Sequence, residues 1–69
     1  MDMRKLVGRN AARLRQAAGL TQEELAERSG FSQQYISKLE KGGRNPTVVT
    51  LYELATGLGA TPADLVRPD

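Results

Sequence analysis

The sequence contains no cysteine and no histidine. Without cysteine no disulfide can support the core, and without both residue types a zinc site is not plausible. The same absences remove the side chains that most often serve as nucleophile or general base. No Gly-rich phosphate loop follows a strand pattern either. We therefore expect neither an enzyme nor a bound cofactor.

Aromatic residues and long apolar runs are also scarce. The three aromatics are Phe31, Tyr35 and Tyr52, and together with the few β-branched runs this composition argues against an all-β fold. No apolar stretch exceeds two consecutive residues, so there is no candidate for a transmembrane helix or a signal-peptide core. We expect a cytoplasmic protein with no membrane partner.

A chain of 69 residues allows one small domain, expected to span 1–69. Such a domain buries only about 60% of the surface that its unfolded chain exposes, so its stability margin is thin.

Charge is unevenly distributed along the chain. Residues 1–44 hold nine basic and five acidic residues, whereas residues 45–69 hold one and three. The basic part favours a polyanion as partner. The alternative is an ordinary solvated surface. The same two interpretations apply to the basic stripe of Lys5, Arg9 and Arg13, in which Arg9 and Arg13 either attract a polyanion over a distance or are simply solvated.

Apolar periodicity predicts an all-α, compact five-helix bundle. The expected spans in chain order are residues 3–18, 21–30, 32–40, 47–58 and 61 onward. The positions expected to face inward are Met3, Leu6, Val7, Asn10, Ala11, Leu14 and Ala18 in the first helix, Tyr35, Ile36 and Leu39 in the third, Val48, Leu51, Leu54, Ala55 and Leu58 in the fourth, and Leu65 and Val66 in the fifth.

Helix starts are well marked. Thr21 and Glu24 are spaced as a capping box, in which side chain and backbone satisfy each other. Thr61 begins a segment with proline at the first helical position and Asp64 at the third. Gly57, inside the fourth expected helix, is a weak point that costs about 1 kcal/mol relative to alanine.

The most informative feature is a tight turn between two short helices. Ala26 is a small residue where the helices must cross, and Gly30 stands at the bend, where a positive φ costs little. Ser32 then begins a helix whose first residues are Gln33 and Gln34. The pattern is typical of a helix-turn-helix whose second helix offers amides to base edges.

These residues resemble the DNA-binding domain of the phage repressor and Cro family, also called the XRE family, over nearly the whole chain. The matching stretches are Leu14-Arg15, Gly19 to Ala26, Gly30, Ile36 to Gly42, Asn45-Pro46, and Leu54-Ala55 with Leu58. The resemblance implies a lambda-repressor-like fold and a bacterial or phage-encoded transcriptional regulator. It also implies a homodimer on a palindromic operator in double-stranded DNA, with the helix over 32–40 in the major groove.

The resemblance further assigns contacts on DNA. The residues expected to contact bases are Gln33, Gln34, Ser37 and Lys38, and those expected to contact phosphate are Thr21, Gln22, Ser32, Arg44 and Asn45. Side-chain chemistry agrees, because glutamine pairs with adenine and lysine donates to guanine. The alternative is that both glutamines are merely exposed and that Lys38 reaches a phosphate. Ser32 and Ser37 could each reach either a base or a phosphate. In the family, residues matching Arg15 and Glu40 form a partly buried ion pair, so we expect a structural role for these two.

Two questions stay open in the sequence. Exposed apolar residues of the fourth and fifth helices are the best candidates for a dimer surface, although they would equally complete the core: Val49, Tyr52, Leu65 and Val66.

The second open question is the role of the domain. Small domains of this resemblance also serve as antitoxins, restriction–modification controllers or activators that touch RNA polymerase. An acidic face of Glu23, Glu24 and Glu27 favours the last role, but acids near a helix start are also ordinary. An antitoxin usually carries a further segment, which does not follow Asp69 here, so a DNA-binding regulator is expected unless the chain is a fragment.

Overall fold

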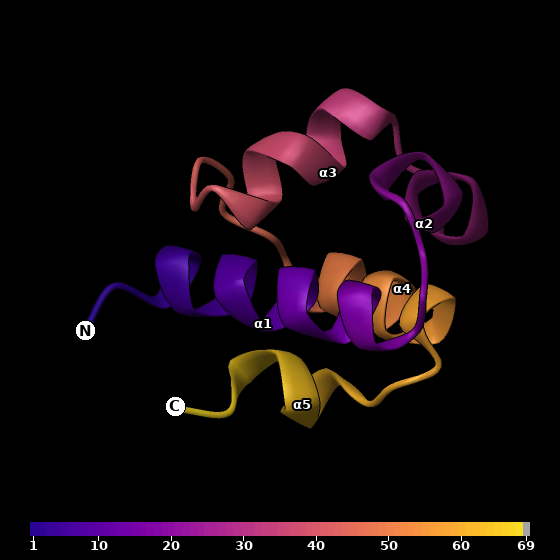
Figure 1. The fold of residues 1–69 in the computed structure, drawn as a ribbon. Coiled ribbons are helices and arrows are strands. Elements are labelled where there is room, and N and C mark those ends of the chain that lie inside the picture. The colour runs from indigo at the N-terminus through magenta and orange to yellow at the C-terminus, as the bar shows by residue number, and fades with distance from the viewer. Residues whose placement is uncertain (69) are drawn as a thin grey trace.

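The computed structural model describes residues 1–68, and within them it holds five helices and no strand. The helices are α1 (Met3–Ala17), α2 (Gln22–Ser29), α3 (Gln33–Glu40), α4 (Val48–Leu58) and α5 (Pro62–Val66) (Figure 1). The all-α, five-helix prediction is confirmed, and the expected helix ends lie within one or two residues of the observed ones. No helix among these residues is long and apolar enough to cross a membrane.

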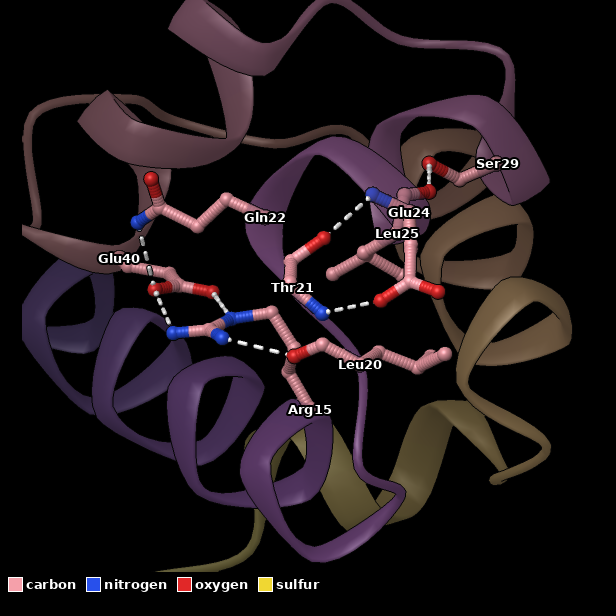
Figure 2. A network of polar contacts seen from close by, with 8 residues as sticks. All are labelled: Arg15, Leu20, Thr21, Gln22, Glu24, Leu25, Ser29 and Glu40. Carbon is pink, nitrogen blue, oxygen red and sulfur yellow. Dashed lines mark hydrogen bonds and ion pairs between the residues drawn. The ribbon is translucent and has the colours of Figure 1, made fainter.

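The helix starts follow the predicted capping chemistry. Thr21 N donates to Glu24 Oε1 at 2.9 Å, and Glu24 N donates to Thr21 Oγ1 at 3.1 Å (Figure 2). Thr61 and Asp64 form the second capping box at the start of α5. These short-range hydrogen bonds satisfy amides that a helix leaves without partners, which is why α2 and α5 begin where the sequence indicates.

One apolar core joins the helices. It is built from Ala11 of α1, Leu25 and Ala26 of α2, Ile36 and Leu39 of α3, Leu54, Ala55 and Leu58 of α4, and Leu65 of α5. Figure 1 shows α3 and α5 on opposite sides of α1. The recognition-helix candidate α3 is therefore held by α1 and α2, with its far side turned away from α5.

Three residues predicted to face inward are exposed instead. Met3 and Val48 are the first residues of α1 and α4 and are 48% and 81% exposed. Ala18 lies at the C-terminal cap of α1 and is also exposed. The apolar period continues through these positions, but each lies beyond the turn that packs on a neighbouring helix. The predicted burial of all three was wrong for that reason.

Leu65 is fully buried among the helices, so of the two alternatives for this residue, dimer surface or core, the structure supports the core. A leucine with no exposed area cannot meet a second copy. Val66 is partly buried. On α4 the situation is reversed, because Val49 and Tyr52 are 66% and 64% exposed. Val49 and Tyr52 therefore do not complete the core, and their part in a dimer surface stays a prediction.

Gly57 is buried where α4 passes α2. A Cβ at this position would lie 3.2 Å from Ser29 Cβ and 3.3 Å from Ser29 N. The view of Gly57 as a plain helix weak point was incomplete, because its missing side chain also lets the two helices approach closely.

Asn10 is a buried polar residue that ties the two ends of the chain together. Its Nδ2 donates to Leu65 O at 2.8 Å and to Arg67 O at 2.9 Å, and its Oδ1 accepts from Arg13 Nη2 at 2.8 Å. The sequence predicted that Asn10 faces inward but not what it binds. Because buried polar groups need partners, these hydrogen bonds explain how an amide is accommodated on the packed face of α1.

Candidate nucleic-acid interface

The exposed side of α3 carries the residues that the sequence assigned to base contact. Ile36 and Leu39 are buried, while Gln33, Gln34 and Lys38 are exposed and Ser37 is partly buried. Residues four apart share a helix face, so Gln34 and Lys38 point the same way, opposite the packed side. The structure therefore presents the amides and the lysine to solvent, as a groove-binding helix requires.

One flank of α3 is anchored by an ion pair. Arg15 Nε donates to Glu40 Oε2 at 2.7 Å and Arg15 Nη2 donates to Glu40 Oε1 at 3.1 Å (Figure 2). Arg15 Nη1 also donates to Leu20 O at 2.9 Å. The two side chains are only 14% and 7% exposed. The structure thus brings Arg15 and Glu40 together as a two-pronged pair that joins α1 to the end of α3.

The ion pair also favours the charged form of Arg15. The hydrogen bond that Arg15 donates to Glu40 raises the pKa of the guanidinium, against the opposing effect of burial. A planar guanidinium bonded to both carboxylate oxygens has little conformational freedom. The pair therefore fixes the position of the C-terminal end of α3 relative to α1.

Gln22, at the start of α2, extends this flank of α3. Its Nε2 donates to Glu40 Oε1 at 3.0 Å (Figure 2). The contact with Glu40 uses one N–H of the Gln22 amide and orients the side chain. The second N–H and the carbonyl oxygen of the amide take no part in this contact. The Glu40 carboxylate therefore connects the end of α3 both to Arg15 of α1 and to Gln22 at the start of α2.

Two other residues assigned to phosphate contact have roles within the fold. Thr21 forms the α2 capping box described above. The Ser32 hydroxyl accepts from Tyr35 N at 3.1 Å and so caps α3. Both side chains are exposed. Their hydroxyls keep a proton to donate, so capping and an outside contact are compatible.

The opposite flank of α3 is built from rings and a cation. The rings of Phe31 and Tyr35 are stacked with centroids 4.7 Å apart and an interplanar angle of 19°. Arg44 comes from the loop after α3, and its Cζ lies 4.9 Å from the centre of the Tyr35 ring. Asn45 follows in the same loop and is exposed.

The sequence missed this second flank. It assigned Tyr35 to the interior, whereas the residue is only partly buried. It placed Arg44 near DNA but gave it no partner within the protein. Nine positions, a helix end and a glycine-rich loop separate the two residues in the chain, so no spacing rule connects them. The aromatic spacing of Phe31 and Tyr35, four residues apart, was the available signal.

A short capped helix, a glycine turn with φ of 80° at Gly30, and an exposed polar helix define a helix-turn-helix domain. Residues 12–65 match the family described as Helix-turn-helix, HTH_3, and the chain belongs to that family. The resemblance inferred from the sequence is thereby confirmed.

The relatives of this chain are regulators. It is 69% identical over 68 residues to the uncharacterized HTH-type transcriptional regulator y4dJ of Sinorhizobium fredii, covering 99% of this chain and 88% of the relative. It is 36% identical over 66 residues to the control protein C.SmaI of Serratia marcescens, covering 96% and 79% of the two chains. By their names these relatives are a transcriptional regulator and a control protein, and the helix-turn-helix family is not one of enzymes, as the composition predicted.

A solved structure supports the same fold. The restriction–modification controller protein C.AhdI from Aeromonas hydrophila matches this chain with a TM-score of 0.86 at 39% identity. The match covers 90% of this chain and 94% of the controller protein. The helical arrangement therefore agrees with that of a regulator of similar length.

Proposed function

We propose that residues 1–69 act as one domain of a transcriptional regulator that binds a palindromic operator as a dimer, with α3 in the major groove. The observation that supports this most strongly is the orientation of α3. Ile36 and Leu39 lock one side into the core, while Gln33 and Gln34 at the leading end are exposed. A helix presented in this way fits the major groove of B-DNA.

The contacts divide by position. On the outer side of α3, the residues proposed to read bases are Gln33, Gln34, Ser37 and Lys38. On the two flanks, the residues proposed to hold phosphates are Thr21, Gln22 and Ser32 on the α2 side, and Arg44 and Asn45 in the loop. The same division is general in protein–DNA complexes, where contacts with the DNA backbone position the protein and contacts with the bases give specificity.

The proposal is tested by selecting bound duplexes from a random pool and measuring variants on the selected site. Gln34→Ala should cost about 1–3 kcal/mol on that site and little on random-sequence duplex, whereas Arg44→Ala should weaken both alike and lower the salt slope by about one. Gln16→Ala, in an exposed glutamine of α1, is the matched control. Equal losses on both duplexes for Gln34→Ala would contradict base reading, and no enriched sequence would contradict specific binding.

An exposed apolar patch supports the dimer. Val48, Val49 and Tyr52 lie within one turn and a half at the start of α4 and are all more than three-fifths exposed. We propose that this patch meets the same patch of a second copy, as a two-fold axis requires. The arrangement would give a palindromic site two recognition helices, one in each of two successive major grooves.

A second candidate function is activation through α2. Glu23 and Glu27 are exposed on that helix, and we propose that they form a contact for RNA polymerase on promoter DNA. Glu24 is engaged in the α2 capping box, so the test uses Glu27→Lys. This variant should keep operator binding nearly intact and abolish activation in a reporter assay. Glu53→Lys, on α4, is the control, and unchanged transcription with Glu27→Lys would reject the contact.

A further inference from the structure

The Phe31–Tyr35–Arg44 stack sits beside the proposed base-reading face of α3. Tyr35 follows Gln34 directly, and Phe31 follows Gly30, the residue that makes the turn between α2 and α3. The stack therefore begins in the helix-turn-helix turn, passes through the recognition helix and ends on a cation of the next loop. The side chains of three segments of the chain meet in this stack.

The order in this stack comes from the turn. Ser32 caps the backbone N–H of Tyr35, and the Phe31 ring packs on the Tyr35 ring at 4.7 Å. Contacts that do not involve Arg44 thus hold both the backbone and the ring of Tyr35 in place. Arg44 itself is exposed, and an exposed arginine otherwise has many rotamers open to it.

We propose that Tyr35 is a positioning residue of the DNA interface: its ring holds the Arg44 guanidinium on the loop-side flank of α3, ready to meet a backbone phosphate. The inference rests on the proposed DNA-binding function. A guanidinium over a ring face is attracted by the ring quadrupole, and a side chain that is already placed loses less freedom on binding. Gln22, held by Glu40, has the corresponding place on the other flank.

A double-mutant cycle on DNA affinity tests the coupling. Affinity for a random-sequence duplex of 30 base pairs, chosen as a probe because a phosphate contact does not depend on sequence, is measured with and without Arg44→Ala in three backgrounds. The backgrounds are wild type, Tyr35→Phe, which keeps the ring, and Tyr35→Leu, which removes it. The affinity loss caused by Arg44→Ala should be about two- to fivefold smaller in Tyr35→Leu than in the other two, the range expected of an exposed cation–π contact.

Lys41→Ala supplies the matched control. Lys41 is an exposed cation at the C-terminal cap of α3 and takes no part in the stack, so its affinity change should be the same in all three backgrounds. Melting temperatures of all variants are recorded in parallel. A stack that serves only stability would show coupling in the melting temperature and none in the affinity, and that result would overturn the inference.

The remaining outcomes are also decisive. Equal losses from Arg44→Ala in all backgrounds, or no loss in wild type, would reject Tyr35 as a positioning residue while DNA binding itself stands. Absence of salt-dependent binding by the wild type would reject the proposed function and this inference together. If Tyr35→Leu does not fold, pentafluorophenylalanine at position 35 keeps the ring shape and reverses its quadrupole, and it should reduce the effect of Arg44→Ala in the same way.

Discussion

Gly8 shows at the scale of one residue how tightly α1 and α3 are packed. A Cβ at this position would lie 2.5 Å from Leu39 O and 2.8 Å from Glu40 O. Both atoms belong to the backbone at the end of α3, so neither can rotate away as a side chain could. Because Glu40 is also the acceptor for Arg15 and Gln22, the close approach at Gly8 helps to set the geometry of that polar network.

Gly8→Ala should therefore destabilise the fold even though alanine is the better helix former by about 1 kcal/mol. Overpacking of a fitted interior costs about 1–3 kcal/mol, and the net effect should appear as a lower melting temperature in circular dichroism. Gly57→Ala is the comparison, because its nearest contact would be 3.2 Å. It should cost less than Gly8→Ala, and a Gly8→Ala protein as stable as wild type would show that α1 and α3 separate easily.

Glu40→Ala should destabilise the protein more strongly than a surface change. It would leave the Arg15 guanidinium, 14% exposed, without its carboxylate, and breaking a buried pair in this way costs about 3–5 kcal/mol. A domain of this size has little stability to spare, so weaker DNA binding should come mainly from unfolding. Thermal melts decide this, with Glu53→Ala as control, and a normal melting temperature for Glu40→Ala would refute the structural role.

At the scale of helices, the three carboxyl groups within residues 1–68 whose pKa is clearly lowered lie at helix starts. Backbone hydrogen bonds are the largest cause in each case: from Lys5 for Asp2, from Thr21 for Glu24 and from Thr61 for Asp64. Each group caps α1, α2 or α5 in its charged form. Folding therefore favours the ionised carboxylates, and acid works against the helix starts.

This linkage predicts the sign of the pH dependence. Since the folded pKa values lie below the ordinary 3.8 for Asp2 and Asp64 and 4.5 for Glu24, the stabilisation is present above these values and is lost as the pH falls through the lowered ones. Glu24→Gln should melt at a lower temperature than wild type at neutral pH, and the two curves should converge in acid. Curves that remain parallel down to about pH 3 would contradict a role for the charged form of Glu24.

The helix starts were predictable because their chemistry is local. Thr21 with Glu24, and Thr61 with Asp64, form contacts three residues apart, and such contacts can be read from spacing alone. The exposure of Met3 and Val48 could not be read in this way, since the apolar period does not show where a neighbouring helix stops. The Tyr35–Arg44 contact and the approach at Gly8 depend on how separate segments pack, so the sequence alone did not reveal them.

At the scale of the whole molecule, the apolar patch on α4 bears on how the regulator recognises DNA. A lone domain contacts few base pairs, and dimers of this fold class place two recognition helices about 34 Å apart on the duplex. The patch formed by Val48, Val49 and Tyr52 lies on a different helix from the proposed base-reading residues. A change in the patch therefore tests the proposed dimer without altering the proposed base contacts.

Val49→Glu is suited to this test, because position 49 lies in the first turn of α4, where an acidic side chain favours the helix. The variant should stay folded but sediment as a monomer at concentrations where the wild type forms a dimer, because two like charges would face each other across the two-fold axis. It should keep wild-type affinity for an isolated half-site and lose affinity for the full palindrome.

Met3→Glu, a matched change of an exposed apolar residue in the first turn of α1, should leave both measurements unaltered. A Val49→Glu protein that dimerises and binds the palindrome as wild type does would place the interface elsewhere, and a wild type that stays monomeric even on the palindrome would reject the dimer.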